Sequence, residues 1–541
     1  MARSNFLPHA ISHHGSLTPT RPAITDGRRT LTYGELVRLA AQFAESARPY
    51  ERVVLLADKS IELIVAMLGV WRVGNLVFPL DPTVPENRIR QLLQRIEPAL
   101  VICNPSLQQL VNCCIPSAEV WTVEDIAKLK PMAGDIPEVD AVLQESTDAY
   151  CLFTSGSTGH PKGVVISHGA IASFYQNIVE HYPVAETSRC LNTSPLFFDV
   201  SILDIFFPLY QGAYVYLYTP LAYIPHRLLA VIDEMQIEYF CAVAPLLRLM
   251  VSSQNFADRF SLTSLRTIMT GADILDVYPV QKWLHKVPGL TVLNGYGPTE
   301  ATCVCLVEAI RNVEPDRSAP YPIGRPLSRV NCLVKTIDKT NDGDEGELLI
   351  GGSQILNRYW DDPEETDRKC LYVQGERYYR TGDRVRLPPG GSYDFLGRVD
   401  DEIKISGYRI HLAEIRRVAK SAIEAEAVVG VIRVHEDSAA IALVFEGQKA
   451  VMEGQMMRLR SALESELPKY MTPRFIAVMR TLPRLGSGKI DVKRTMQTIS
   501  EANLDKREGL EFFLDVQSRN QPACCAITLA RWRRSETVSE R

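Results

Sequence analysis

The chain has 541 residues, and 59 Lys and Arg against 64 Asp and Glu give it a net charge of −5 at pH 7. A length well above the roughly 150 residues of a typical domain predicts more than one folding unit. The even charge balance argues against the basic surface that nucleic-acid binding requires, so nucleic acid is not an expected partner.

The composition is that of an ordinary globular enzyme, with 46% hydrophobic and 23% charged residues. Apolar stretches such as 63–71 are much shorter than the roughly 20 residues of a membrane span, so no membrane partner is expected. Residues 1–16 lack the apolar core of a secretory signal, and the 12 cysteines are scattered without a CxxC pattern. These features predict a cytoplasmic protein.

The first three hundred residues alternate helix and strand patterns. Thr32 and Glu35 have the spacing of a capping box, and apolar residues then recur at the helical period over 36–43. This alternation predicts parallel βαβ units, and therefore a large N-terminal α/β domain of doubly wound sheets. The predicted elements that follow this first helix are a strand at 52–57, a helix at 62–71, and strands at 76–80 and 99–102.

After about residue 315 the pattern becomes richer in short strands, at 346–352 and in a hairpin around the Pro-Pro-Gly-Gly turn at 388–391. Further elements predict a small, mobile α+β lid: a helix at 412–423, strands at 428–434 and 441–445, and a helix at 456–467. The predicted boundaries are a core of residues 1–399 with its β-rich subdomain at about 315–399, a C-terminal lid at 400–500, and a polar, flexible tail at 501–541.

A loop of glycines and hydroxyl residues lies between two apolar runs at 152–166. Glycines let backbone N–H groups close on an anion, hydroxyls add donors, and Lys162 adds a positive charge. The loop is not a Walker motif, because no Gly-Lys-[Ser/Thr] follows at the required spacing. The predicted phosphate-binding residues are Thr154, Ser155, Gly156, Ser157, Thr158, Gly159 and Lys162.

This loop resembles the signature of the adenylate-forming superfamily, which includes acyl-CoA synthetases, peptide-synthetase adenylation domains and luciferases. Five further segments resemble family motifs in family order: 31–36, 294–300, 379–383, 397–400 and 488–491. The resemblance implies that ATP and a carboxylate give an acyl-adenylate and pyrophosphate, and that a thiol then attacks the adenylate. It also implies ATP and Mg²⁺ as the cofactors.

The resemblance assigns roles to single residues. Lys489 would be the catalytic lysine that bridges the substrate carboxylate and the α-phosphate, Glu300 the Mg²⁺ ligand, and Asp400 the hinge of the lid. The loop at 407–409 would face the pantetheine tunnel after the lid has moved. The further nucleotide-binding residues would be Asn294, Gly295, Tyr296 and Gly297 at adenine, Thr299 at the α-phosphate, and Asp383 with Arg398 at the ribose.

The segment 198–204 resembles peptide synthetases and D-alanine ligases, in which its first aspartate, here Asp199, binds the α-ammonium of an amino acid. A carboxylate in an apolar pocket is costly unless a cation pairs with it, so it would select zwitterions over fatty acids. The alternative is that Asp199 only caps the following helix. The other pocket walls carried over by position are Val200, Leu203, Ala242, Ile268, Thr270, Gly295, Cys303 and Val304.

These walls are small or apolar, so the expected substrate is a small neutral amino acid, with L-proline favoured. The chain is most like a stand-alone proline- or D-alanine-activating ligase that loads the phosphopantetheine of a separate carrier protein, in non-ribosomal peptide or related secondary-metabolite synthesis. The Arg-rich tail could contact that carrier. The alternatives are an acyl- or aryl-CoA ligase, a luciferase-type oxygenase and a catalytically silent scaffold.

Overall fold

The computed structural model describes residues 6–47, 51–136, 138–139, 143–156, 159–219, 224–253, 256, 259–336, 344–405, 407–423, 425–435, 438–447, 455–485, 489–501 and 512–515. Ser157 and Thr158 of the predicted phosphate loop lie outside these ranges. Of the predicted tail, residues 502–511 and 516–541 lie outside them as well.

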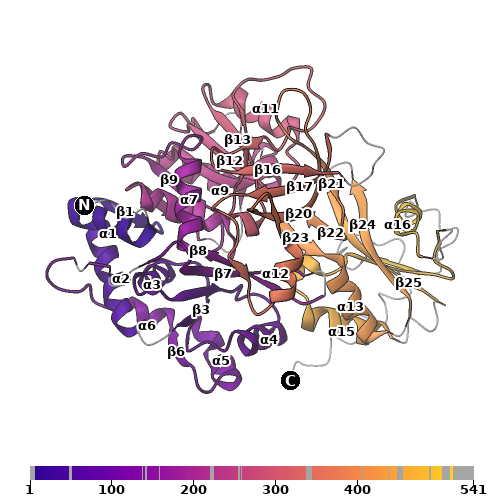
Figure 1. Cartoon of the computed structure of the whole chain (residues 1–541), viewed down its shortest axis with the longest axis horizontal. Coiled ribbons are helices and arrows are strands. Elements are labelled where there is room, and N and C mark those ends of the chain that lie inside the picture. The colour runs from indigo at the N-terminus through magenta and orange to yellow at the C-terminus, as the bar shows by residue number, and fades with distance from the viewer. Residues whose placement is uncertain are drawn as a thin grey trace.

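A seven-stranded sheet forms one half of the large N-terminal domain (Figure 1). Its central strands are parallel and almost fully buried, as expected for strands that read as continuous apolar runs. The strand order is β18 (Arg358–Tyr359), β8 (Lys162–Ser167), β7 (Asp148–Thr154), β4 (Leu76–Pro79), β3 (Arg52–Leu56), β5 (Leu100–Cys103) and β6 (Glu119–Thr122).

A nine-stranded sheet forms the other half and includes several of the residues predicted to line the pocket. Strands β11, β12 and β13 are parallel neighbours, which aligns Ala242, Thr270 and Asn294 across the sheet. The order is β15 (Arg325–Pro326), β14 (Leu306–Ile310), β13 (Thr291–Tyr296), β12 (Thr267–Gly271), β11 (Tyr239–Val243), β9 (Arg189–Asn192), β10 (Tyr214–Leu217), β1 (Pro22–Thr25) and β2 (Thr30–Thr32).

Helices cover both sheets. The predicted capping box is present, because the Thr32 backbone N–H donates to Glu35 at 2.8 Å and the Glu35 N–H donates back to the Thr32 hydroxyl at 3.2 Å. The helices of the large domain are α1 (Leu7–Leu17), α2 (Tyr33–Ala47), α3 (Ile61–Arg72), α4 (Glu86–Ile96), α5 (Gln108–Cys114), α6 (Val123–Ala127), α7 (His168–Ile178), α8 (Phe207–Tyr210), α9 (Pro225–Glu234), α10 (Ala244–Val251) and α11 (Val277–Lys286).

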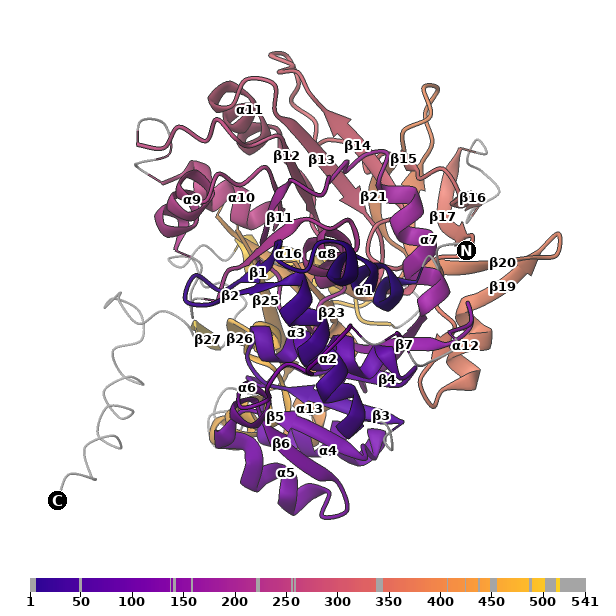
Figure 2. The same ribbon diagram turned by 90° about the vertical axis from the view of Figure 1, so that its left-hand side faces the viewer.

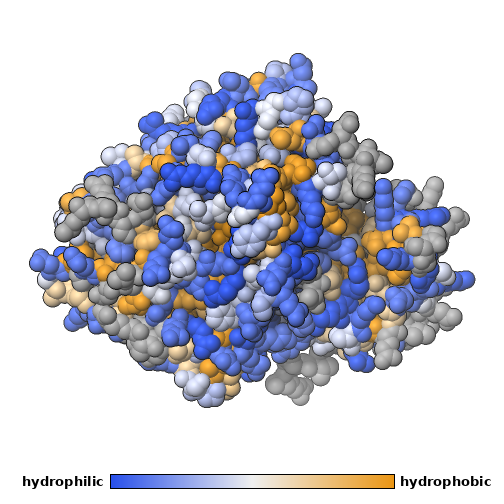
Figure 3. Space-filling model, in the orientation of Figure 1, coloured by the Kyte–Doolittle hydropathy of each residue, from blue (hydrophilic) through white to orange (hydrophobic). Residues whose placement is uncertain are grey.

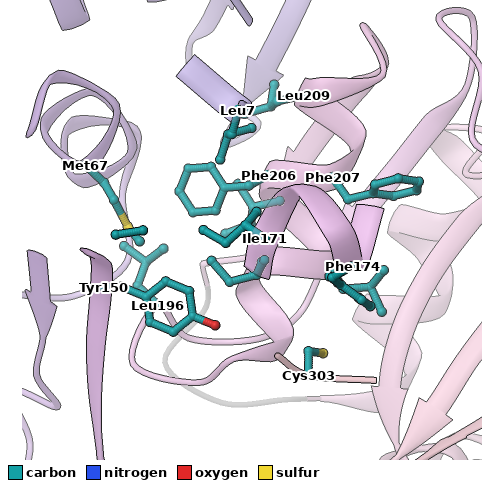
Figure 4. Packing of buried hydrophobic residues seen from close by; sticks show 14 of the residues in the cluster. Leu7, Met67, Tyr150, Ile171, Phe174, Leu196, Phe206, Phe207, Leu209 and Cys303 are labelled. Carbon is teal, nitrogen blue, oxygen red and sulfur yellow. The ribbon is translucent and has the colours of Figure 1, made fainter. Parts of the chain in front are cut away.

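The main hydrophobic core lies between the two sheets. Helix α3 is apolar on all sides and buried along its length, so it belongs inside this core and not on the surface. Figure 4 shows Phe174, Phe206 and Phe207 in the core, with Cys303 at the lower edge of the view. Residues Ile202–Phe206 form a π-helical stretch just ahead of α8, directly after the segment that carries Asp199.

A β-rich part follows, in which β20 pairs with β17, β19 and β21. Its hairpin β20–β21 encloses the predicted Pro-Pro-Gly-Gly turn. The elements are β16 (Asn331–Lys335), β17 (Glu345–Gly351), α12 (Pro363–Lys369), β19 (Cys370–Val373), β20 (Glu376–Arg386) and β21 (Asp394–Arg398).

The smaller C-terminal domain begins with the hairpin β22 (Glu402–Ile405) and β23 (Tyr408–His411), called here the lid hairpin. A four-stranded sheet with its own hydrophobic core follows (Figures 1 and 2). Its elements are α13 (Leu412–Ala422), β24 (Ala427–His435), β25 (Ser438–Glu446), α15 (Met456–Glu466), β26 (Phe475–Met479), α16 (Val492–Glu501) and β27 (Phe512–Asp515), the last from the predicted tail.

The structure therefore confirms the predicted α/β fold class, with a large N-terminal and a small C-terminal domain. Among the described residues, no helix combines the length and the apolar character needed to cross a membrane. The face in Figure 3 is mainly hydrophilic, and its hydrophobic residues lie in small separate patches.

Candidate active site

The predicted phosphate loop joins two antiparallel strands, with Thr154 at the end of β7 opposite Lys162 at the start of β8. The loop turns so tightly that a Cβ at Gly156 would lie 2.0 Å from the His160 carbonyl oxygen, so only glycine fits there. Gly159 has φ +80°, which glycine adopts at little cost. The loop geometry thus depends on the glycines that the sequence pattern singled out.

Lys162 lies beneath this loop, with its Nζ 2.5 Å from Oε1 of Glu365 on α12. Both side chains are buried, and Arg368 holds the same carboxylate from its other side. The predicted charge at the phosphate loop is therefore already paired. This partner is 203 residues away in the sequence, so the loop pattern could not have revealed it.

The backbone of residues 294–297 packs closely against neighbouring segments. A Cβ at Gly297 would lie 2.2 Å from the Cys303 carbonyl oxygen, and one at Gly295 would lie 2.8 Å from Sδ of Met269. The Asn294 side-chain amide donates to the Pro322 carbonyl at 2.7 Å. Glycine at these two positions therefore lets the end of β13 pack closely against Met269 and the Cys303 segment.

Asp383, the predicted ribose ligand, is held on two sides. Tyr296 donates its hydroxyl to Oδ2, and Arg398 lies 2.5 Å from Oδ1. Arg398 also pairs with the predicted hinge residue Asp400 at 2.7 Å and with Glu402 at 3.0 Å. One guanidinium therefore connects the ribose position, the hinge and the lid hairpin.

Glu300 is almost fully buried, and both of its oxygens have partners. Tyr359 donates its hydroxyl to Oε1 at 2.7 Å, and Arg409 of the lid hairpin donates to Oε2 at 2.6 Å. Burial alone would raise the pKa of Glu300, but Arg409 and Tyr359 outweigh it and lower that pKa to about 2. Glu300 is therefore ionised at neutral pH.

Glu300 lies in a turn that Gln354 braces from below. The Gln354 amide donates to the carbonyls of Ala301 at 2.9 Å and Val304 at 2.8 Å, and Thr302 donates its hydroxyl back to the Gln354 carbonyl at 2.5 Å. Thr302 has φ +54°, an unfavourable backbone for a β-branched residue, so the turn needs this support.

Asp199 is half-buried beside the Glu300 turn. The Thr299 hydroxyl and the Val200 N–H donate to its carboxylate, and Lys404 and Glu300 lie close enough to affect its charge. Burial is the main effect and raises the pKa of Asp199 above its ordinary value. A cap interpretation accounts only for the contact with Val200, because Thr299 belongs to a different segment.

The predicted pocket walls come from several elements. Val200 lies just before the π-helical stretch and Leu203 within it, and Ala242 and Thr270 are neighbours on β11 and β12. The Thr270 hydroxyl is buried and has no hydrogen-bond partner in the described part of the chain. The remaining buried walls are Ile268, Cys303 and Val304.

The lid hairpin lies against residues that flank the predicted pocket walls. Its Gly407 has φ +84°, and a Cβ there would lie 3.0 Å from Cγ1 of Val243, the residue after Ala242. Tyr408 contacts Phe198 with ring centroids 5.4 Å apart, and Lys404 Nζ lies 5.5 Å from the centroid of Tyr296. The structure thus places 407–409 at the site, next to the Asp199 segment.

Lys489 lies elsewhere, in an exposed turn before α16. Its carbonyl accepts the Leu485 N–H at 2.8 Å. The other predicted residues around Glu300, Asp383 and the phosphate loop lie together, whereas Lys489 is on the part of the small domain whose helix α16 packs against β24.

Glu300 fits Mg²⁺, because it supplies one ionised hard oxygen and leaves the other ligand positions to phosphates and water. Within the described residues, no group of three or more His, Cys, Asp or Glu side chains could hold a metal by themselves.

Comparison with known proteins shows the family. A model described as AMP-binding enzyme matches residues 11–360, so the chain belongs to this family of AMP-binding enzymes. Tyrocidine synthase 2 of Brevibacillus parabrevis is 31% identical over 501 residues, which cover 90% of this chain but only 13% of that protein.

Two solved structures share the fold. The Vibrio cholerae adenylation domain AlmE, in complex with glycyl-adenosine-5′-phosphate, has a TM-score of 0.78 at 22% identity and covers 92% of this chain and 98% of its own. The Bacillus subtilis o-succinylbenzoate CoA synthetase has a TM-score of 0.76 at 20% identity, covering 90% and 98%. At these identities the likeness shows the fold alone.

The sequence did not predict Tyr359, Gln354, Glu365, Lys404 or Glu402 at the site. Most of them act through a partner far away in the chain, whereas Glu402 pairs with Arg398 and Arg409 close by, and none belongs to the Gly- or hydroxyl-rich patterns that carried the prediction. A weak signal exists only for Glu402 and Lys404, which lie close to the predicted hinge.

Proposed function

We propose that the chain activates a small neutral amino acid, with L-proline as the first candidate, and loads it onto the phosphopantetheine thiol of a carrier protein. The substrate carboxylate attacks the α-phosphorus of ATP and pyrophosphate leaves. The carrier thiolate then attacks the carbonyl carbon of the aminoacyl-adenylate and AMP leaves. This is the chemistry of non-ribosomal peptide and related secondary-metabolite synthesis.

One observation carries the amino acid assignment: Asp199 is a half-buried carboxylate among predicted pocket walls that are mainly apolar, and this burial raises its pKa. Its nearest described donors, the Thr299 hydroxyl and the Val200 N–H, are neutral. Lys404 contributes a nearby positive charge, and a substrate ammonium would add a cation in direct contact with the carboxylate, which a fatty or aryl acid would not. Cys303 adds no charge, because burial raises the pKa of its thiol well above neutrality.

The first step joins two anions, so it requires charge neutralisation and alignment. Mg²⁺ at Glu300 would neutralise phosphate charge. The loop from Thr154 to Lys162 would hold the β- and γ-phosphates, and Asp383 with Arg398 would hold the ribose. Lys489 would enter the site when the small domain turns about Asp400, and the lid hairpin would return for the transfer step.

Amino-acid-dependent ATP–pyrophosphate exchange tests the proposal, over the twenty L-amino acids, D-alanine, and a few aryl and short fatty acids. The expected result is exchange with one or a few small neutral amino acids, and its loss in Asp199→Asn with ATP binding intact. Exchange with aryl or acyl acids alone, and product formation with free CoA, would establish a CoA ligase. Loading of an added carrier in trans checks the expectation of a separate carrier protein.

A further inference from the structure

Arg409 of the lid hairpin contacts Glu300, the residue proposed to bind the metal. Arg409 comes from β23 of the small domain, 109 residues after Glu300, and its Nη1 lies 2.6 Å from Glu300 Oε2. Its Nε lies 2.5 Å from Glu402 on the neighbouring strand, so the guanidinium is fixed from both sides. Tyr359 uses the other Glu300 oxygen.

A divalent cation and this guanidinium would compete for Glu300. Mg²⁺ binds carboxylate oxygen at about 2.1 Å and requires near-octahedral ligands around it. The guanidinium already fills the space in front of Oε2, and two positive charges at contact distance in a buried site repel strongly. One of the two has to leave when the other binds.

The same hairpin also forms hydrogen bonds with the predicted phosphate loop. Ser155 donates its hydroxyl to the Arg409 carbonyl at 2.8 Å and accepts the His411 N–H at 3.0 Å. Arg417, from the following helix α13, donates to the Gly159 carbonyl at 3.0 Å. The lid therefore contacts both the metal position and the phosphate position in this arrangement.

We propose that Arg409 and the divalent cation bind Glu300 in turn, which makes Arg409 the positioning residue of the transfer step. The inference rests on the proposed function, because it takes Glu300 as the metal ligand. With metal and nucleotide bound, Arg409 is displaced and the lid hairpin stays off Ser155. Once the cation has left with pyrophosphate, Arg409 neutralises Glu300 and holds the hairpin over the pocket.

This exchange leaves Glu300 paired with a positive charge in both arrangements. A buried carboxylate that loses its only cationic partner is strongly destabilising. Loss of a cation from Glu300 would therefore favour the contact between Arg409 and Glu300. Arg409 competes with the metal and not with the amino acid.

Mn²⁺ titration followed by electron paramagnetic resonance tests the inference, in the full chain with a non-hydrolysable ATP analogue. Arg409→Gln is expected to lower the Mn²⁺ concentration at half-saturation about tenfold, the factor typical of a lost charge-assisted contact. For Arg409→Lys, the Mn²⁺ concentration at half-saturation should lie between those of Arg409→Gln and the wild type. Arg416→Gln is the matched control, because Arg416 is on the same domain but pairs with exposed Asp401 at 3.7 Å.

Hydrogen exchange at the His411 amide gives a second readout that a purely structural role would not move. In the wild type, Mn²⁺ with the analogue should speed this exchange, because the contact with Ser155 is broken. In Arg409→Gln the exchange should be fast already without the cation. Thermal melting of each variant checks that it folds. If Arg409→Gln does not fold, Arg409→Lys is compared with the wild type instead.

Equal Mn²⁺ affinity in wild type, Arg409→Gln and Arg409→Lys would overturn the inference, as would an equal shift in Arg416→Gln. If the analogue binds but Mn²⁺ does not, the metal role of Glu300 fails and the exchange at Glu300 fails with it. If Mn²⁺ binds equally in all variants, only the inference about Arg409 fails. The two failures are therefore distinguishable.

Discussion

Arg398 lies 2.5 Å from Asp383 and 2.7 Å from Asp400, so a single side chain ties the proposed ribose ligand to the proposed hinge. Asp383 and Glu402, which Arg398 also contacts, are nearly inaccessible to solvent. Solvent and exposed side chains therefore cannot replace Arg398 as the cation beside these acids.

Replacing this arginine should be costly. Arg398→Gln leaves the buried Asp383 without a cationic partner, while Glu402 keeps its contact with Arg409, and we expect the free energy of unfolding to fall by about 3 kcal/mol. Urea denaturation measures it. Arg386→Gln is the control, because Arg386 pairs with Asp394 at the exposed end of the same hairpin and should change little. Equal losses in both variants would contradict the buried-network explanation.

Substrate affinity should weaken in acid. Burial raises the pKa of Asp199, and an ammonium ligand would lower it again, so the substrate binds the ionised form. As the pH falls through the raised pKa, Asp199 takes up a proton and the dissociation constant of the amino acid rises. Calorimetry at a series of pH values measures this, and Asp199→Asn should bind weakly with no such pH dependence. A pH-independent wild type would speak against Asp199 as the ammonium ligand.

The unpaired Thr270 hydroxyl gives a stability prediction. Removing a buried hydroxyl that makes no hydrogen bond should help folding, so Thr270→Val is expected to gain about 1 kcal/mol. Thr193→Val provides the contrast, because the Thr193 hydroxyl donates to the Cys241 carbonyl at 2.7 Å and its loss should cost about 1 kcal/mol. Chemical denaturation of the three proteins decides. If Thr270→Val also loses exchange activity, its hydroxyl contacts the substrate.

A buried charge below the Asp199 segment should make stability depend on pH. Asp204 accepts the Thr193 and Ser194 N–H groups at 3.2 and 3.1 Å, and burial raises its pKa to about 6 despite the nearby Lys59. Between about pH 4 and pH 6, Asp204 therefore keeps its proton in the folded protein, whereas it has already lost that proton in the unfolded chain. Stability should therefore fall as the pH rises from about 4 to about 6.

Asp204→Asn should abolish that decline, which urea unfolding at several pH values would reveal. Lys59 should make the stability depend on pH in the alkaline range, because burial lowers its pKa to about 8. For this group stability should rise again from about pH 8 to about 10.5. A wild-type stability that stays flat in both ranges would show that the two charges compensate each other fully.

Local patterns predicted the fold well. The Thr32–Glu35 pair, the all-apolar helix α3 and the buried strands β3, β4 and β5 are determined by residues within a few positions of one another, and their predicted ends differ from the structure by one or two residues. Such short-range capping and burial rules need no knowledge of the rest of the chain.

The contacts within the site were harder to predict, because they join residues that are far apart in sequence. Nothing near Lys162 indicates that Glu365 pairs with it, and nothing near Glu300 indicates Arg409 or Tyr359. Family resemblance supplied the candidate residues but not which lid arrangement the chain adopts. The position of Lys489 away from Glu300 follows from that arrangement.

The π-helical stretch at Ile202–Phe206 has a consequence for how specificity could change. A π-helix holds more residues per turn than an α-helix and is most often found as a single inserted turn at a functional position. Deleting one residue there would let the turn relax to an α-helix and rotate the segment before it, including Val200 and Asp199. In such a chain the pocket would be reshaped by an insertion or deletion, with every wall residue unchanged.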